Sequence, residues 1–309
     1  NATFVKLAAA AVIAVAAIVG IAKFTQNPKD NLGALNVSLD VSKTITGPTT
    51  HTFPDGSGVK LAEGASIRVF PPELQFRRGF ELVTGRIEVT VAKGDGEFIV
   101  TSRHGDTVKA LGTQFAMDLL DGMPENAQRP VRMLSVEVTE GAVEVRNSHG
   151  AATLKSGQSV VAAAHRAPYG FNEDPALPES LRQRIAAMIK AFETGDKAAW
   201  AANYNMNYLY KLGKGQTQYD PNLFGGSAED AERIKQAVAS VNSPEELRQL
   251  FLGTINITEP TKVYVRWVEI SQNGRHAAAE CVQRKSDNHL VVTTPQWHDF
   301  DGAWWQIDD

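Results

Sequence analysis

The chain has 309 residues, of which 43% are hydrophobic, 21% are charged and 8% are aromatic, and it contains one cysteine. This composition excludes a disordered chain, a collagen-like chain and a disulfide-stapled scaffold, and the length suggests about two domains of roughly 100 to 200 residues each. The formal net charge of −4 comes from 31 basic and 35 acidic residues that are scattered along the chain. Because no basic stripe is present to neutralise a phosphate backbone, nucleic acid is not an expected partner.

The strongest apolar run of the chain lies near its N-terminal end. Leu7 to Ala22 contains no polar side chain, and Lys6 and Lys23 flank it. As a helix, Ala2 to Phe24 would be about 34 Å long, which is enough to cross a hydrocarbon core of roughly 30 Å. Residues 1–26 are therefore predicted to form a single transmembrane helix.

A secretory signal peptide is the alternative interpretation of this run. Gly20-Ile21-Ala22 resembles the small-x-small pattern that precedes a cleavage site. The first residue, Asn1, is not methionine, so further chain is expected upstream, and a transmembrane anchor is favoured. Both interpretations place the rest of the chain outside the cytoplasm, starting with a polar linker over residues 27–39.

The sequence of residues 40–165 alternates with a period of two. Ile87, Val89 and Val91 alternate with polar residues, and the pattern recurs at Val136 and Val138. Such alternation predicts half-buried strands, and the Asp-Gly and Glu-Gly pairs between them predict tight turns. Many short strands with little helix favour an antiparallel β-sandwich or roll. The polar stretch from Asp121 to Pro130 is expected to be a surface loop.

The order of short motifs in this region resembles the FecR family. The motifs are Phe53-Pro54-Asp55-Gly56-Ser57, Leu61 with Gly64-Ala65-Ser66, Arg78-x-Phe80-x-Leu82-x-x-Gly85, Phe98-x-Val100, Gly112-Thr113-x-Phe115, Val136-x-Val138-x-Glu140-Gly141-x-Val143-x-Val145 and Leu154-x-x-Gly157-Gln158. One position departs from the family pattern, because Gly85 is followed by Arg86 where the family commonly has a glutamate.

The resemblance implies a function and a location. FecR-type domains are periplasmic, follow one transmembrane helix, and belong to regulators that hold or activate an extracytoplasmic-function sigma factor at their cytoplasmic end. It therefore implies a protein of the bacterial inner membrane whose C-terminal domains are periplasmic. The sigma factor would be bound by the segment upstream of Asn1.

Residues 166–178 are rich in proline and are predicted to be a linker, after which helical spacing begins. Leu181, Ile185, Met188 and Phe192 form an apolar stripe that stops at Gly195. Three more helices are expected: one capped by Asp196 and containing Trp200 and Tyr204, one opened by Ser227, and one opened by the capping box Ser243-Pro244-Glu245-Glu246. Strands are then expected over Lys262 to Ile270, His276 to Lys285, Leu290 to Thr294 and Trp304 to Ile307.

Helices followed by a curved antiparallel sheet, ending in Asp301-Gly302-x-Trp304-Trp305-x-Ile307, resemble the α+β cone fold of the SnoaL-like, nuclear-transport-factor-type superfamily. The resemblance covers residues 179–309 and implies a pocket between helices and sheet. The candidate ligand-binding residues of this pocket are Tyr204 and Tyr208 from the helices and Trp267, Glu280 and His289 from the sheet. Core packing is the competing interpretation of the aromatic residues among them.

No motif of known chemistry occurs in the chain. The seven histidines show no pair at the sequence spacing of a metal site, and Cys281 has no second cysteine as a partner. A phosphate loop, a dinucleotide fingerprint and a nucleophile elbow are also missing. We therefore expect no metal, no cofactor and no catalytic residues.

These observations favour an envelope signal-transduction regulator of the FecR type that senses a periplasmic ligand or partner. The alternative is an envelope module that binds or scaffolds a glycan, peptide or protein without any sigma factor. A SnoaL-like enzyme that uses the cone pocket is the less favoured third hypothesis.

Overall fold

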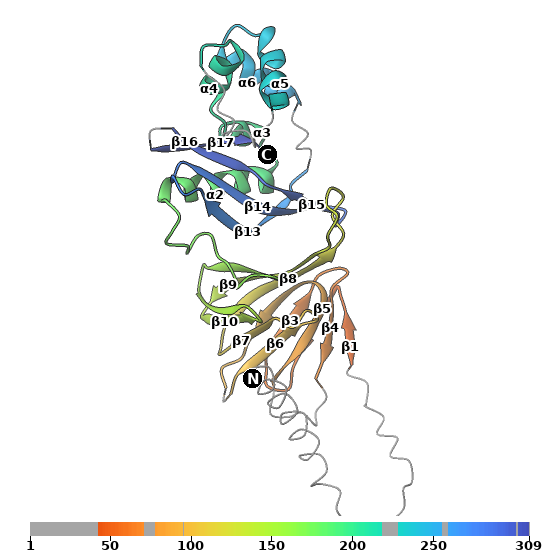
Figure 1. The fold of residues 1–309 in the computed structure, drawn as a ribbon. Helices are drawn as coiled ribbons and strands as arrows, with labels where there is room; N and C mark the ends of the chain where they lie inside the picture. The colour runs from red at the N-terminus through yellow and green to blue at the C-terminus, as the bar shows by residue number, and fades with distance from the viewer. Residues whose placement is uncertain are drawn as a thin grey trace, which may run out of the picture. The chain divides into compact units, whose positions relative to one another are not determined.

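The computed structural model describes residues 43–70, 78–94, 96–217, 228–254, 259–300 and 302–308 (Figure 1). The predicted transmembrane helix over residues 1–26 and the linker over residues 27–39 lie outside these ranges. Within them, no helix has the length and apolar character that crossing a bilayer requires. The described residues belong to one compact unit with two sheets, which we treat below as a β module and an α+β module.

The β module spans residues 44–163, and its described residues form twelve strands. They are β1 (Thr44–Thr46), β2 (Thr49–Thr52), β3 (Gly58–Leu61), β4 (Ser66–Val69), β5 (Arg78–Thr90), β6 (Phe98–Ser102), β7 (Thr107–Ala110), β8 (Gln114–Gly122), β9 (Val131–Glu140), β10 (Ala142–Asn147), β11 (Gly150–Lys155) and β12 (Ser159–Ala163).

Strand β5 organises this module because it belongs to both halves of the sheet. Its first half pairs with β4 and β6, and its second half pairs with β3 and β8. The main path through the sheet runs β11-β10-β7-β6-β5-β8-β9-β12. The expectation of a wholly antiparallel sheet is wrong at one place, since β5 and β6 are parallel. The second half of β5 pairs with β8 in the other half of the sheet. The chain then returns, and β6 lies beside the first half of β5 and runs in the same direction.

The alternation predicted from the sequence is confirmed in β5. Ile87, Val89 and Val91 are buried in the core of the module, whereas Glu88 and Thr90 are exposed. One apolar cluster receives side chains from both halves of the sheet. The expected loop over residues 121–130 begins two residues later, because Asp121 and Gly122 still belong to β8.

The α+β module spans residues 179–308 and contains five described helices and five strands. The helices are α2 (Glu179–Thr194), α3 (Lys197–Ala201), α4 (Met206–Gly213), α5 (Ala228–Ala239) and α6 (Pro244–Thr254). The strands are β13 (Lys262–Ile270), β14 (His276–Arg284), β15 (Leu290–Thr293), β16 (Gln296–Phe300) and β17 (Ala303–Asp308).

Helix α2 follows the sequence prediction closely. Leu181, Ile185, Met188 and Phe192 are buried, and Gly195 ends the helix in the left-handed conformation. The next predicted helix is too long, because α3 ends at Ala201, so Tyr204 lies outside it. The Asn205 side chain accepts a hydrogen bond from the backbone N–H of Tyr208 at 3.0 Å and thereby starts α4, which the sequence analysis did not predict.

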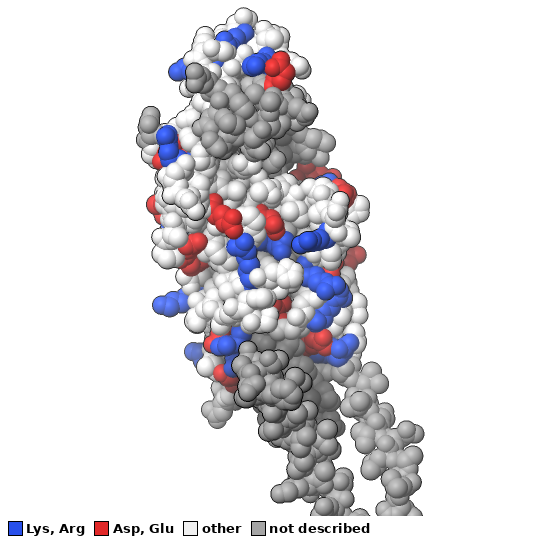
Figure 2. All heavy atoms as spheres, in the orientation of Figure 1, with Lys and Arg blue, Asp and Glu red and all other residues white. Residues whose placement is uncertain are grey.

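The second sheet is antiparallel throughout its described pairs, in the order β13-β14-β16-β17, with β15 beside β14. The helices and this sheet share an apolar core that includes Trp200, Trp297 and Trp304. Trp304 is buried and Trp305 is half-buried beneath the Arg184 guanidinium, as expected for neighbours on one strand. Strand β16 was not predicted. On the face drawn in Figure 2, Lys and Arg side chains lie among Asp and Glu side chains over the described residues.

Candidate functional site at the junction of the two modules

The two modules meet through a small apolar core of their own. Its residues from the β module are Leu120, Val131, Met133 and Val161, and those from the α+β module are Tyr264, Val282 and Leu290. All seven are buried. Strand β8 is accordingly buried on both faces from Phe115 to Leu120, because one face packs in the β module and the other meets β13 and β14.

Asp118 lies at the centre of this junction. Its side chain projects from β8, and only 1% of it is exposed. The Tyr264 hydroxyl donates a hydrogen bond to its Oδ2 atom at 2.5 Å, and Arg284 Nη1 donates to its Oδ1 atom at 2.6 Å. Arg86, which faces Asp118 across the β5–β8 register, places its Nη1 atom 3.9 Å from Oδ2. A single buried carboxylate thus joins both modules.

This arrangement compensates for the burial of the charge. A buried carboxylate is costly unless it is paired and hydrogen-bonded, and here a guanidinium from each module faces it. Burial, followed by the negative charge of Asp118, raises the pKa of the Tyr264 hydroxyl. Burial alone would lower the pKa of Arg284, but Asp118 raises it above its ordinary value. Tyr264 therefore stays a donor, and Arg284 stays charged.

Arg86 contributes to the junction at the position that departs from the FecR pattern. A glutamate there would set a second carboxylate beside Asp118, whereas the arginine adds a second cation. Arg86, which replaces the family's glutamate, is therefore compatible with the buried Asp118 on the neighbouring strand β8.

A cleft of about 520 Å³ opens beside this network. Its walls come from β9, β12, the segment at residues 169–172, α2 and β13, and its charged residues are Glu137, Lys190, Glu193 and Lys262. Burial lowers the pKa of Lys262, and the nearby Arg86 adds to that effect. Burial likewise raises the pKa of Glu193. Because both modules line it, a small polar molecule in this cleft would contact both at once.

The predicted surface loop after β8 also contacts the α+β module. The side chain of Asn126 donates to the carbonyl of Val292 at 2.6 Å and accepts from its backbone N–H at 3.0 Å. Glu125 lies 3.2 Å from Lys285 Nζ and 2.8 Å from His289 Nδ1. Hydrogen bonds from Lys285 and then His289 lower the pKa of Glu125. These exposed ion pairs are weak, but the paired bonds of Asn126 fix the register of the contact.

The predicted linker over residues 166–178 is held by both modules. Tyr169 and Val161 exchange two backbone hydrogen bonds of 2.9 Å, which extend the pairing of β12. The Tyr169 hydroxyl donates to Asp174 at 2.9 Å, and Arg182 of α2 donates to the carbonyl of Asp174 at 2.8 Å. The segment is thus fixed at both ends, which gives the modules a defined connection.

The structure does not gather the five predicted pocket residues into one site. Tyr204 is buried, packs on Trp200 and Phe251, and accepts a hydrogen bond from Gln306 at 2.9 Å. Tyr208 packs on Phe300. These two tyrosines contribute to the helix and sheet packing of the α+β module, which is the competing interpretation given above.

The other three predicted residues lie elsewhere on the sheet. Trp267 is half-buried, and the Arg166 guanidinium stacks on it at 4.9 Å. Glu280 forms an ion pair with Arg266. His289 is exposed and contacts Glu125 of the β module. His289 therefore belongs to the junction and not to a cone pocket.

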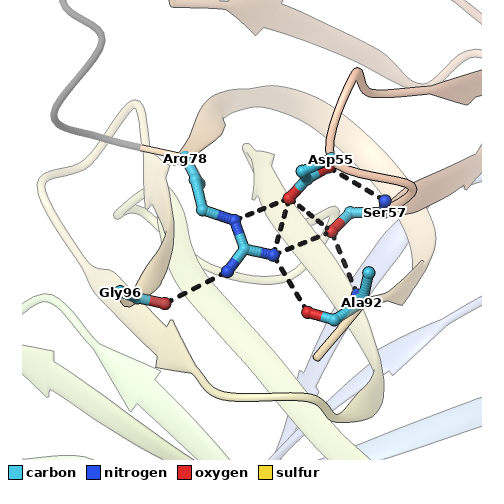
Figure 3. A network of polar contacts seen from close by, with 5 residues as sticks. All are labelled: Asp55, Ser57, Arg78, Ala92 and Gly96. Atoms are coloured by element: carbon cyan, nitrogen blue, oxygen red, sulfur yellow. Dashed lines mark hydrogen bonds and ion pairs between the residues drawn. The ribbon is translucent and has the colours of Figure 1, made fainter. Parts of the chain in front are cut away.

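A separate polar network holds the first FecR motif in place (Figure 3). The Arg78 side chain donates to Asp55 Oδ2 at 2.6 Å, to the carbonyls of Ala92 at 2.9 Å and Gly96 at 3.1 Å, and to Ser57 Oγ at 3.4 Å. Burial opposes ionisation of Asp55, but hydrogen bonds from Ser57 and Arg78 lower its pKa below the ordinary value. The motif thus anchors the start of β5 to two loops, which is a structural role.

Among the described residues, no three His, Cys, Asp or Glu side chains are grouped as a metal site would need. Cys281 is buried within β14.

Sequence reasoning did not identify Asp118 as a functional candidate. The available indication was the run Phe115-Ala116-Met117-Asp118-Leu119-Leu120, which is apolar on both strand faces except for one acid. Strands buried on both faces have near-continuous apolar sequences, so the lone carboxylate marks an inward-facing charge that needs a partner.

Comparison with known proteins supports the first predicted resemblance. Residues 45–144 match the family described as FecR protein, so this part of the chain is a FecR-family domain. A comparison with curated proteins finds no match. The likeness of residues 179–309 to the SnoaL-like superfamily stays a prediction.

Two crystal structures of proteins from Parabacteroides distasonis, each described as a "putative anti-sigma factor", resemble part of the chain. They were solved at 1.65 and 2.50 Å and share 24% and 22% sequence identity with it, each at a TM-score of 0.33. The alignments cover 48% and 50% of this chain and 60% and 70% of the other chains. The chain therefore spans less than two thirds of the first of these proteins.

Proposed function

We propose that this protein regulates an extracytoplasmic-function sigma factor as a single-pass protein of the bacterial inner membrane. The match of residues 45–144 to the FecR family carries the proposal. The apolar run from Leu7 to Ala22 supports an anchor, with the two described modules in the periplasm. The sigma factor would bind on the cytoplasmic side of the membrane.

In this proposal the junction transmits the input. A ligand or partner that engages the α+β module would alter the contacts of Tyr264 and Arg284 with Asp118, which lies in the FecR-family domain. Because a buried ion pair is stable only with good geometry, small shifts of β13 or β14 would change its free energy sharply. The protein carries out no catalytic step in this scheme.

A reporter assay in the source bacterium tests the proposal. Deleting the gene should change transcription from the promoters of one extracytoplasmic-function sigma factor, and that factor should co-purify with the full-length protein. The variant Asp118→Asn should alter the reporter at equal protein abundance, whereas Asp287→Asn, at an exposed site, should not. If deletion leaves every such sigma-factor regulon unchanged, the proposal is wrong.

Membrane topology is tested separately. Alkaline phosphatase fused after Asp309 is active only in the periplasm, so the proposal predicts an active fusion in the membrane fraction. An inactive fusion, or a full-length protein that stays in the aqueous fraction, would contradict the envelope location.

The cleft beside Asp118 favours a second candidate function, an envelope module that binds a small polar molecule and has no sigma factor. Its volume of about 520 Å³ is in the range of ligand sites. The deletion experiment separates the two, because this alternative predicts no change in any sigma-factor regulon.

A further inference from the structure

Two histidines of the second sheet face each other across neighbouring strands. His276 begins β14, and His298 lies in β16 directly opposite to it in the antiparallel register. Their ring centroids are 4.5 Å apart, and their Nδ1 atoms are 3.2 Å apart. His298 is 6% exposed, and His276 is half-buried. The pair is far apart in the sequence, so the spacing of histidines along the chain could not reveal it.

This contact between two Nδ1 atoms has a specific chemistry. In a hydrogen bond between two imidazole nitrogens, one must donate and the other must accept, so the pair holds one proton between its Nδ1 atoms. A metal ion can replace that proton if the nitrogens are correctly spaced. Two bonds of about 2.0 to 2.1 Å set the nitrogens about 2.9 Å apart at the square-planar angle that Cu²⁺ and Ni²⁺ prefer, and about 3.3 Å apart at the tetrahedral angle of Zn²⁺. The observed separation of 3.2 Å lies within this range.

The surroundings hold the two rings in this arrangement. The Phe300 ring contacts His298 edge to face at a centroid distance of 4.6 Å, and Tyr208 packs on Phe300 at 4.7 Å. Both histidines also sit on paired strands, where the backbone fixes their separation. Ligands that are held in position before the metal arrives lose less conformational entropy on binding.

We propose that His276 and His298 form a binding site for a divalent transition metal of the class that imidazole prefers, namely Cu²⁺, Ni²⁺ or Zn²⁺. The ion binds both Nδ1 atoms. The ring that donated the shared proton gives it up to solvent and takes up a proton at Nε2, so that both imidazoles stay neutral. Water completes the coordination, as in an open and exchangeable site. Affinity increases from Ni²⁺ to Cu²⁺ and is lower again for Zn²⁺. The inference concerns the α+β module alone and does not depend on the proposed function.

Cu²⁺ binding to the purified full chain in detergent tests this site. Electron paramagnetic resonance with one equivalent of Cu²⁺ should report two equatorial nitrogen ligands. His276 is only half-buried, so His276→Gln should leave the fold intact. The affinity for Cu²⁺ should fall by at least about tenfold, because replacing even a residue that only hydrogen-bonds to a metal ligand costs about that much. His289→Gln, at an exposed histidine outside the pair, should bind Cu²⁺ as the wild type does.

The result has a clear alternative outcome. Wild-type affinity in His276→Gln, or a copper spectrum with one nitrogen ligand, would overturn the proposal and leave the pair as a structural hydrogen bond. Because His298 is buried, His298→Gln is informative only if its circular dichroism spectrum matches that of the wild type. His276→Gln and the wild-type spectrum decide the question without it.

Discussion

Tyr264 and Asp118 are 146 positions apart in the chain and are joined by a hydrogen bond of 2.5 Å in the buried junction of the two modules. Tyr264 donates from β13 of the second sheet, and Asp118 accepts from β8 of the FecR-family domain. Since Arg284 and Arg86 face the same carboxylate, this one side chain is the shared counter-charge of two arginines from different modules.

The first prediction concerns the charge of that carboxylate. Asp118→Asn keeps the shape of the side chain but leaves Arg284 and Arg86 without a counter-charge. Removing one partner of a buried pair costs about 3 to 5 kcal/mol. We expect about 3 kcal/mol here, because both arginines are partly exposed. Urea unfolding of the full chain measures the loss.

Asp287→Asn is the matched control, because Asp287 is an exposed aspartate near His289. It should change the free energy of unfolding by no more than about 0.5 kcal/mol. Equal effects of the two substitutions would show that Asp118 is not the buried anchor of the junction.

The sequence predicted those parts of the structure that depend on local periodicity. The buried set Ile87, Val89 and Val91 and the stripe of α2 up to Phe192 follow from alternation and helical spacing, which act over a few residues. Asp196 is likewise predictable as a helix cap, because its side chain accepts a hydrogen bond from the backbone N–H of Ala199, only three residues ahead.

The candidate site could not be predicted in the same way, because its partners are distant in sequence. Asp118 meets Arg284 across 166 positions, and no local pattern encodes such a contact. His289 was assigned to a cone pocket, whereas the loop that carries it brings it to Glu125 of the other module. The end of α3 was missed because Asn205 provides a second cap close behind Asp196.

The second prediction concerns pH. Burial, with a further contribution from Arg86, lowers the pKa of Lys262, so the native protein loses this proton at a lower pH than the unfolded chain does. Between the native pKa and the ordinary value of 10.5, the unfolded state holds more protons, and the free energy of unfolding therefore rises with pH. Lys262→Met removes this rise and also the cost of burying the ammonium group.

We therefore expect Lys262→Met to be more stable than the wild type at pH 7 and to lose that advantage as the pH approaches 10. Urea unfolding at pH 7, 9 and 10 checks both statements. Lys190→Met, at the exposed wall of the same cleft, controls for the loss of one positive charge. A constant difference between Lys262→Met and wild type at all three values would refute the prediction.

The third prediction concerns the network drawn in Figure 3. Arg78→Lys keeps the charge but cannot reach the acceptors on Asp55, Ala92 and Gly96 together, because an ammonium lacks the planar fork of a guanidinium. Hydrogen bonds to charged groups contribute about 1.5 to 3 kcal/mol, so we expect a loss of about 2 kcal/mol in thermal or urea unfolding.

Arg68→Lys provides the comparison for Arg78→Lys. Arg68 is 48% exposed and forms an ion pair with Glu81, and exposed pairs contribute about 0.2 to 1 kcal/mol. The loss should therefore be clearly smaller than for Arg78→Lys. Similar losses would mean that Arg78 contributes only its charge.

The fourth prediction tests the parallel pairing of β5 with β6. Gly79 has a φ of +143°, and a Cβ atom at this position would lie 1.7 Å from the carbonyl oxygen of its pairing partner Ile99. Because that oxygen is backbone, the strand itself would have to move. Gly79→Ala should therefore lower the free energy of unfolding by at least about 4 kcal/mol. A loss of this size is exceptional for one substitution and here reflects the backbone clash.

Gly96→Ala separates the steric effect from backbone strain. Gly96 also has a positive φ, of +95°, but its Cβ would meet no atom within 4 Å. Its substitution should cost only about 1 to 2 kcal/mol, the penalty of a side chain at positive φ. If Gly79→Ala costs no more than Gly96→Ala in urea unfolding, β6 does not lie against the first half of β5. The parallel pairing of β5 with β6, which distinguishes this module from a simple antiparallel sandwich, would then be wrong.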